Sequence, residues 1–289
     1  MLEPYINVFT RPRLKSARML LGFSGWMDGG SVSTGTAGYF IAKLHAQRFA
    51  AIDSHEFYIY GLPGSMETSA MLRPHVQIKD GIVSGYKEPA GEFFCAAEQN
   101  LVIFRGREPN TAWEEFGDAV FALAAEFGIR SIYFAGSVAG MVPHTRDPRF
   151  FGTVSDESLK PLLHKYGLRP SNYEGPSSIV TYLMTRAREN GIEMFTIVAE
   201  IPSYVQGRNA KCIESTARKL NAILEMRLDL SDLKIISDEF DRRLATVVQG
   251  RAELGEFVRK METDYDQEVL DSEMPDLKAW LEQQNIRLD

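Results

Sequence analysis

Short apolar runs alternate with amphipathic stretches along the first 230 residues, and this alternation predicts the secondary structure. Continuous apolar runs that end near a glycine or a proline predict buried strands at 18–25, 56–61, 100–106, 131–137 and 194–202. Apolar residues at helical spacing predict helices over 31–49, 110–128, 156–167, 175–191 and 209–228. The pattern therefore predicts an α/β fold in which a mostly parallel or mixed sheet is covered by helices on both faces.

Local signals refine this picture at turns and helix ends. Residues 75–87 alternate around Asp80-Gly81, a pair typical of a β-hairpin turn. The residue types before the predicted helices suggest the N-caps Ser31 or Ser33, Asn110 or Thr111, and Ser155. Gly128 should end one helix, and Pro161 should shorten or kink another.

The pattern changes at about Ser231. Apolar or aromatic residues then recur every three or four positions as far as Tyr265, with Arg251 as the one exception. Gly250 and Gly255 leave two options open, an interrupted long helix or a helical hairpin, and residues 274–284 predict one more short helix. We therefore divide the chain into an α/β domain, 1–230, and a helical appendage, 231–289, which packs on its own core or contacts another subunit.

Composition narrows the classes of function. The chain has 289 residues, 44% of them hydrophobic and 25% charged, which are ordinary globular values. Its net charge of −7 disfavours general binding of nucleic acid or of an anionic membrane. The sequence shows no signal peptide and no apolar run long enough to cross a bilayer, so we expect a soluble cytoplasmic protein.

Metal and thiol chemistry find little support in the sequence. The two cysteines, Cys95 and Cys212, lie in apolar or helical surroundings and form no CxxC pair. The five histidines show no ligand spacing, and no paired carboxylates suggest a catalytic metal. We predict neither a metal nor a cofactor.

Three predicted strands end in polar or glycine-rich loops, at 24–30, 136–146 and 202–208. In a parallel sheet the carboxyl ends of strands share one edge, where ligand sites form. The first loop resembles a nucleophile elbow at Ser24, but Trp26 stands where the elbow requires a small residue. Asp28 and Gly29 then precede a helix whose free N–H groups can bind an anion or a carbonyl.

The second and third loops carry the remaining candidate side chains. His144 can transfer protons, and Arg146 beside Thr145 can bind a carboxylate or phosphate. The same residues can equally hold the loop in shape. Ser177 lies at a helix start, where it can bind an anion or simply cap the helix, and Tyr204 follows the last strand. Glu200 needs a partner if it is buried, and Arg146 is a candidate.

Four segments together resemble the PAC2 family, the proteasome assembly chaperone 2-like proteins. They are GWMDGG, GSVAGMVPHTRDPRFFGTVSD, YEGPSSIVTYLMTRARENGI and AEIPSYVQGRNAKCIESTARKLNAIL, and the resemblance runs from about Pro4 to Leu230. It implies a three-layer α/β/α sandwich like that of purine nucleoside phosphorylases and peptidyl-tRNA hydrolases, and homo-oligomerisation. It implies no catalytic residue.

The resemblance also bears on partners. Eukaryotic and archaeal relatives hold proteasome subunits, commonly through a C-terminal tail of a hydrophobic residue, a tyrosine and one further residue. This sequence reads NIRLD at its end and has no tyrosine there, which puts proteasome docking in doubt.

Two hypotheses follow. The first is a non-catalytic, homo-oligomeric binding or assembly protein. A trimer is one oligomer that we consider, and any other protein partner is not identified by the sequence. The alternative is an enzyme of phosphorylase- or hydrolase-like architecture that binds an anionic or nucleoside ligand. In either case the ligand-binding residues would be Ser24, Asp28, Gly29, His144, Thr145, Arg146, Ser177 and Tyr204.

Overall fold

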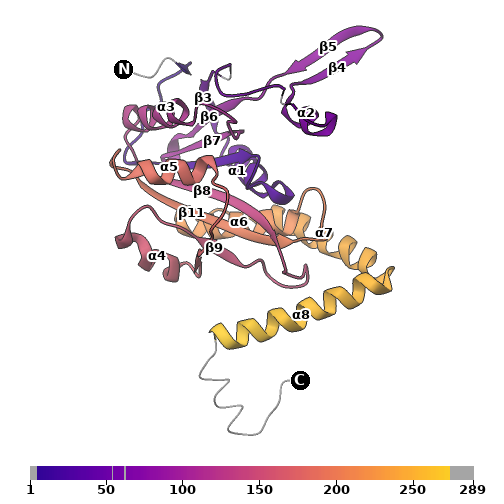
Figure 1. Ribbon diagram of the computed structural model, residues 1–289. Helices are drawn as coiled ribbons and strands as arrows, with labels where there is room; N and C mark the ends of the chain where they lie inside the picture. The colour runs from indigo at the N-terminus through magenta and orange to yellow at the C-terminus, as the bar shows by residue number, and fades with distance from the viewer. Residues whose placement is uncertain (1–4, 54, 62, 274–289) are drawn as a thin grey trace.

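A nine-stranded mixed sheet forms the centre of the molecule in the computed structural model, which describes residues 5–53, 55–61 and 63–273 (Figure 1). The four central strands run parallel, so their carboxyl ends share one edge. In sheet order the strands are β1 (Ile6–Val8), β3 (Gln47–Ile52), β6 (Gly91–Ala96), β7 (Leu101–Arg107), β2 (Ala17–Ser24), β8 (Ile129–Gly140), β11 (Glu193–Pro202), β9 (Phe150–Gly152) and β10 (Arg169–Pro170).

Helices cover both faces of this sheet and give the three-layer α/β/α arrangement that the sequence predicts. Helices α1 (Val32–Lys43) and α6 (Ala210–Ile223) pack against each other on one face. Helices α3 (Trp113–Glu126) and α5 (Ile179–Ala187) share the other. Each face has its own apolar core, which is the result expected for strands buried on both sides.

Alternation along the strands divides side chains between the two cores. In β2, Met19 and Leu21 join the core beneath α3 and α5, whereas Leu20 joins the core beneath α1 and α6. All three are fully buried. Because successive strand residues point to opposite faces, one continuous apolar run supplies both layers.

The hairpin predicted around Asp80-Gly81 is present as β4 (His75–Lys79) and β5 (Ile82–Lys87). Both turn residues have positive φ, 51° and 77°, as a two-residue hairpin turn of this kind requires. The hairpin is a separate two-stranded sheet that stands away from the body of the molecule (Figure 1). A short helix, α2 (Met66–Leu72), precedes it.

The region after residue 230 forms a helical hairpin, which was one of the two options left open by the sequence. Helix α7 (Ser231–Gln249) ends at Gly250, and α8 (Ala252–Glu273) begins two residues later. Leu233, Val248, Val258 and Met261 are buried. The short helix expected over 274–284 lies outside the described residues.

Several local expectations were wrong. Residues 56–61 form no strand, because buried Phe57 and Tyr58 pack from a loop into the core. The first helix ends at Lys43, and Gln47 to Phe49 belong to β3. Five strands were not predicted from the sequence, β1, β3, β6, β9 and β10, of which β1, β9 and β10 have only two or three residues.

The caps differ as well. Ser31 and Ala112, the residues before α1 and α3, have positive φ, and neither side chain accepts a capping hydrogen bond. Ser33 Oγ instead accepts a hydrogen bond from Phe23 N. Neither Asn110 nor Thr111 caps α3; Asn110 accepts from Ile59 N. Asp156, rather than Ser155, caps the turn before the short α4 (Lys160–Lys165), which contains Pro161. One-turn 3-10 helices lie at Gly29–Ser31, Ala97–Gln99 and Glu157–Leu159.

Candidate functional site

The loops after β2, β8 and β11 lie side by side at the carboxyl edge of the sheet. Ser137 N donates to Met27 O at 2.9 Å, which joins the first loop to the end of β8. Ser203 N donates to Gly140 O at 3.1 Å, which joins β8 to the loop after β11. The parallel order of these three strands brings together loops that are far apart in the sequence.

The first loop uses its candidate residues to shape the start of α1. Ser24 is the last residue of β2 and has ordinary strand geometry, so it does not stand on a nucleophile elbow. The Asp28 carboxylate accepts from Thr34 N at 3.0 Å and from Thr34 Oγ1 at 2.7 Å, and burial raises the pKa of Asp28. Gly29 O accepts from Ser137 Oγ at 2.5 Å.

A carboxylate fills the N-terminus of α5, the second place where the sequence suggests an anion. Glu108, just after β7, accepts from Ile179 N at 2.9 Å and from Trp26 N at 2.8 Å. Ser178 caps the helix through Thr181 N, whereas Ser177 is exposed and donates a hydrogen bond to Ser178 O. The chain therefore supplies its own anion at this helix start.

His144 lies buried in the second loop, 4% exposed, and Tyr204 of the third loop binds it twice. Tyr204 Oη accepts from His144 N at 2.8 Å and lies 2.7 Å from His144 Nδ1. One hydrogen bond joins the hydroxyl and the ring nitrogen, and its donor depends on the tautomer of the imidazole. Burial lowers the pKa of His144, in agreement with a neutral ring.

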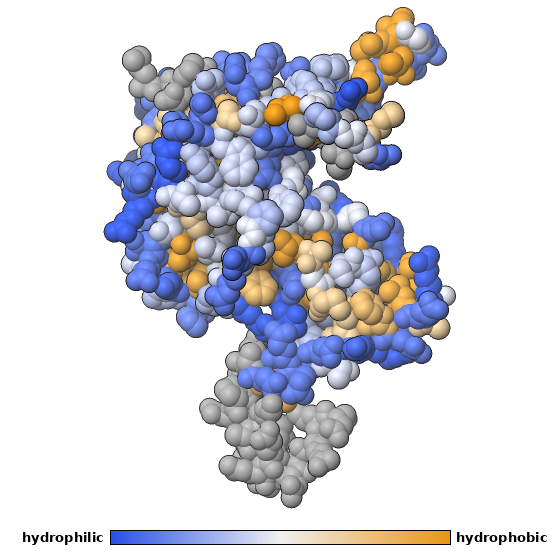
Figure 2. Space-filling model, in the orientation of Figure 1, coloured by the Kyte–Doolittle hydropathy of each residue, from blue (hydrophilic) through white to orange (hydrophobic). Residues whose placement is uncertain are grey.

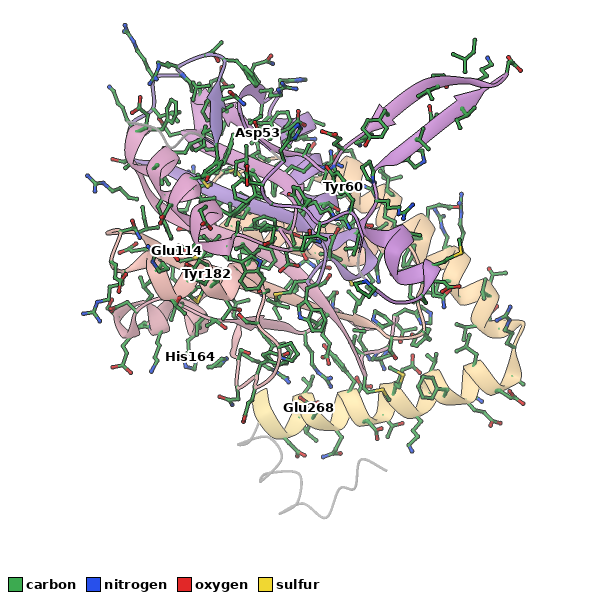
Figure 3. All side chains as sticks on the ribbon, turned by 45° about the horizontal axis from the view of Figure 1, so that its top comes forward. Asp53, Tyr60, Glu114, His164, Tyr182 and Glu268 are labelled. Carbon is green, nitrogen blue, oxygen red and sulfur yellow. The ribbon has the colours of Figure 1, made fainter. Side chains whose placement is uncertain are left out.

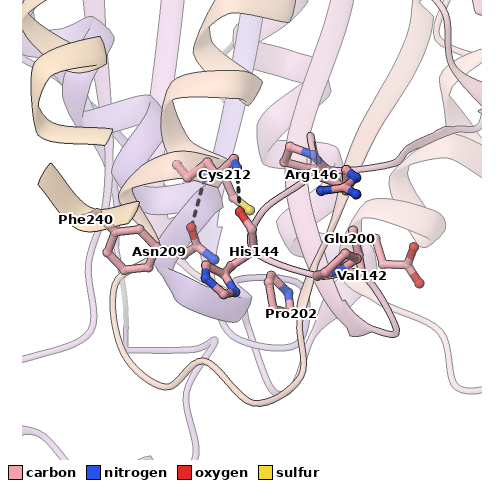
Figure 4. Close-up of a pocket in the computed structure, with 11 residues that line it drawn as sticks. Val142, His144, Arg146, Glu200, Pro202, Asn209, Cys212 and Phe240 are labelled. Atoms are coloured by element: carbon pink, nitrogen blue, oxygen red, sulfur yellow. Dashed lines mark hydrogen bonds between the residues drawn. The ribbon is translucent and has the colours of Figure 1, made fainter. Parts of the chain in front are cut away.

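Helices α6 and α7 close the space beside His144. Lys211 of α6 donates to His144 O at 2.5 Å and pairs with Asp241 of α7 at 3.2 Å. The crevice that His144 and Lys211 share with Asn209, Cys212 and Phe240 has a volume of about 10 Å³ (Figure 4). That volume accommodates at most one water molecule, so a nucleoside does not fit here in this arrangement.

Helix α8 covers the outer side of the same loop. Arg146 forms a bidentate pair with Asp266, with Nε–Oδ1 and Nη2–Oδ2 distances of 2.7 and 2.6 Å. Thr145 Oγ1 donates to Glu262, one helical turn earlier on α8. Arg146 lowers the pKa of Asp266 through these hydrogen bonds.

A second ion-pair network lies beside the first and corrects one expectation. Glu200 pairs with Arg149 at 3.3 Å rather than with Arg146. Arg149 also pairs with Glu268 of α8 at 2.5 Å, and Glu268 reaches Arg169 of β10 as well. Figure 3 shows Glu268 toward the carboxyl end of α8. Tyr265 completes the contact, with its hydroxyl 3.0 Å from Asp147 O and its ring under the Arg149 guanidinium.

The eight candidate residues thus fall into separate groups. Ser24, Asp28 and Gly29 shape the β2 loop, and Ser177 lies at the start of α5. The other four, His144, Thr145, Arg146 and Tyr204, lie under α7 and α8. Glu108 and the carboxylates of α8 were not predicted from the sequence. One available signal was the four-residue spacing of Glu262 and Asp266 on an amphipathic helix.

In the described part of the chain, no group of three or more His, Cys, Asp or Glu side chains is placed to hold a metal ion. No helix in that part combines the length and the apolar character needed to span a bilayer.

Comparisons with known proteins place this geometry in a family. A proteasome-assembly chaperone homologue from Mycobacterium tuberculosis is 24% identical, with a TM-score of 0.72 over 83% of this chain and 99% of its own. A Mycobacterium tuberculosis protein of unknown function is 22% identical, with a TM-score of 0.82 over 96% of this chain and 95% of its own. PbaB, an archaeal proteasome activator from Pyrococcus furiosus, is 21% identical, with a TM-score of 0.63 over 86% of this chain and 99% of its own.

These structural likenesses show a shared fold. A comparison with curated protein sequences finds no match. The model of the PAC2 family matches residues 22–248, which include all three loops, α6 and most of α7. The chain belongs to the PAC2 family.

Proposed function

We propose that this protein is a non-catalytic, homo-oligomeric binding or assembly protein of the cytoplasm, which acts by holding protein partners. The observation that carries the proposal is the use of His144 as a fixed part of the loop, although an open hollow of about 450 Å³ between α7 and α8 also reaches His144 and Thr145. Both the Nδ1 atom and the backbone N–H of His144, the candidate acid or base, form hydrogen bonds with Tyr204, and the crevice beside the ring has a volume of about 10 Å³. A histidine used in this way holds a loop.

The β4–β5 hairpin supports self-association. Val76 pairs with Tyr86 and Ile78 with Val83 across its two strands, and these four side chains are between 47% and 66% exposed. Figure 2 shows the hairpin as an apolar projection from the body. Two-stranded ribbons are marginally stable alone in water, so an apolar ribbon of this kind gains stability when a second copy covers it.

The relatives support a protein as the other partner. One structural neighbour is a proteasome-assembly chaperone homologue and another is an archaeal proteasome activator, and both are covered almost completely by the match. Proteins that act on assemblies bind other proteins. We extend this role to the present chain as a proposal, with the partner's identity left open.

The mass in solution tests self-association. Full-length protein should elute with a light-scattering mass that is a multiple of 32.5 kDa, with a trimer among the forms considered. Ile78→Asp should lower that mass, because it places a charge in the proposed contact. Gln77→Asp adds the same charge on the opposite face of the ribbon and should leave the mass unchanged. A monomeric wild type would contradict the proposal.

Thermal unfolding with small ligands tests the non-catalytic part. A ligand at a hundred times its dissociation constant should stabilise the fold by about 2.7 kcal/mol. We expect no rise in melting temperature with phosphate, nucleosides or nucleotides. A rise that Arg146→Ala abolishes would instead support an enzyme that binds an anionic or nucleoside ligand.

A further inference from the structure

Three arginines of the α/β domain face helix α8. Arg146 and Arg149 belong to the loop between β8 and β9, and Arg169 belongs to β10, so two separate segments contribute to this arginine face. Each of the three pairs with a carboxylate of α8: Arg146 with Asp266, and Arg149 and Arg169 with Glu268. The contact between α8 and the α/β domain is therefore largely one of opposite charges.

The face of α8 that meets the arginines has a regular composition. Val258, Met261 and Tyr265 lie at helical spacing, and the first two are 3% and 2% exposed. The carboxylates of Glu262 and Asp266 follow one position after Met261 and Tyr265. An apolar stripe beside an acidic stripe is the pattern by which an amphipathic helix recognises a groove.

The arginine face has a hydrogen-bond donor that α8 leaves without a partner. The side chain of Arg149 is 10% exposed, and its Nε is buried with no hydrogen-bond partner among the described residues. Both of its terminal nitrogens are occupied, by Glu200 and by Glu268. A buried guanidinium donor without a partner is costly, so another arrangement of carboxylates could satisfy this face better.

Helix α8 also lies outside the two main apolar cores. Neither apolar core beneath the sheet's covering helices includes a residue of α8, as far as the described residues go. Gly250 and Arg251 alone separate it from α7, and it runs along the lower edge of the molecule (Figure 1). Displacement of α8 would therefore leave the two main cores intact.

We propose that the arginine face is a docking surface for an acidic amphipathic helix of a protein partner, and that α8 occupies this surface in cis until the partner displaces it. The proposal rests on the proposed function, since it names the chemistry of the partner. The partner helix carries apolar residues at positions i, i+3 and i+7 and carboxylates at i+4, i+8 and i+10, which is the spacing of Val258, Met261, Tyr265, Glu262, Asp266 and Glu268.

Other occupants fit less well. A free anion would leave the apolar contacts of Val258 and Met261 unreplaced. A nucleic acid would meet a protein of net charge −7. Because α8 is tethered, its effective concentration at the face is high, and a partner helix in solution must compete against it. The intact chain therefore binds weakly, and loss of the carboxylates of α8 increases binding.

A labelled synthetic peptide of residues 252–273 is the probe for fluorescence anisotropy with full-length protein. A triple variant, Glu262→Gln with Asp266→Asn and Glu268→Gln, weakens the docking of α8 in cis and retains the three arginines. The peptide should bind this variant at least about tenfold more tightly than wild type. Arg146→Ala with Arg169→Ala, added to the triple variant, should reverse that gain, with folding checked by thermal unfolding.

A peptide that carries E262Q, D266N and E268Q is the matched control, and it should bind the triple variant about tenfold more weakly than the acidic peptide. Equal binding of the two peptides, or no binding of the acidic peptide to the triple variant, would overturn the proposal. Phosphate that displaces the peptide more strongly than sodium chloride of equal ionic strength would also overturn it, in favour of a free anion. The mass and ligand measurements of the preceding subsection do not depend on these outcomes.

Discussion

The hydroxyl of Tyr204 binds both the backbone and the ring of His144, at 2.8 Å from the amide nitrogen and 2.7 Å from Nδ1. One side chain from the loop after β11 thereby fixes the loop after β8. The Tyr204 ring also meets Phe257 of α8 edge-on, at 6.2 Å between centroids. The contact thus links both loops to the helical appendage.

Removal of this hydroxyl should destabilise the fold. Tyr204→Phe leaves the buried N–H and Nδ1 of His144 without their partner, and we expect a loss of about 1–3 kcal/mol in the free energy of unfolding. Urea denaturation measures it. Tyr133→Phe is the control, because no hydrogen bond of the Tyr133 hydroxyl is found in the described part of the chain. Equal stability of the two variants would contradict the structural role of Tyr204.

Burial of His144 should make stability depend on pH. Burial lowers the pKa of His144 in the folded protein below its ordinary value of 6.5, so the unfolded chain binds the proton more readily. The stability that the buried, neutral His144 ring contributes is fully present above about pH 6.5. It is lost as the pH falls from there toward the lowered pKa of His144.

His144→Asn isolates this effect, because the asparagine amide can take the place of Nδ1 beside Tyr204 but does not titrate. The free energy of unfolding of the wild type minus that of the variant should decrease as the pH falls below about 6.5. Groups common to both proteins, including Asp241, Lys211 and Glu262 around the histidine, cancel in the difference to first order. A difference that stays constant from neutral to weakly acid pH would show that His144 does not titrate in this way.

The central architecture could be predicted from the sequence because its signals are local. Strands β2, β7, β8 and β11 are continuous apolar runs, and the Asp80-Gly81 turn determines the hairpin by its backbone geometry. The short strands β1, β9 and β10 could not be found, since two or three residues carry no periodicity. Residues 56–61 misled the analysis because the core buries apolar loop residues as readily as strand residues.

The candidate site was predictable in part. The order of parallel strands brings its three loops together, but the partners of His144 and Arg146 come from distant segments. Asp266 is 120 residues from Arg146, and Tyr204 is 60 from His144. Single residues at such separations leave no spacing pattern. The amphipathic character of α8 was therefore the one sequence signal that this helix packs against another part of the protein.

The Arg146–Asp266 pair should show salt-dependent coupling. A double-mutant cycle with Arg146→Ala and Asp266→Ala should give a coupling energy of about 0.5–1 kcal/mol, because the pair is bidentate but the side chains are 35% and 52% exposed. High salt should reduce this energy. The Arg242–Glu239 pair within α7 is the control and should couple less strongly. Coupling no larger than in the control would mean that Arg146 does little to hold α8.

Glu108 should prove important to the edge of the sheet, although no sequence motif singles it out. Its carboxylate joins the β2 loop to α5 by accepting from Trp26 N and Ile179 N, and it lies at the helix end where a negative charge is favoured. In Glu108→Gln the amide nitrogen cannot accept a hydrogen bond, so one of the two N–H groups loses its partner. We expect a loss of about 1–2 kcal/mol in the free energy of unfolding, and Glu98→Gln, at an exposed residue after β6, should cost much less. Faster hydrogen exchange at Trp26 and Ile179 in the Glu108 variant would locate the effect, whereas unchanged exchange at both amides would contradict this role.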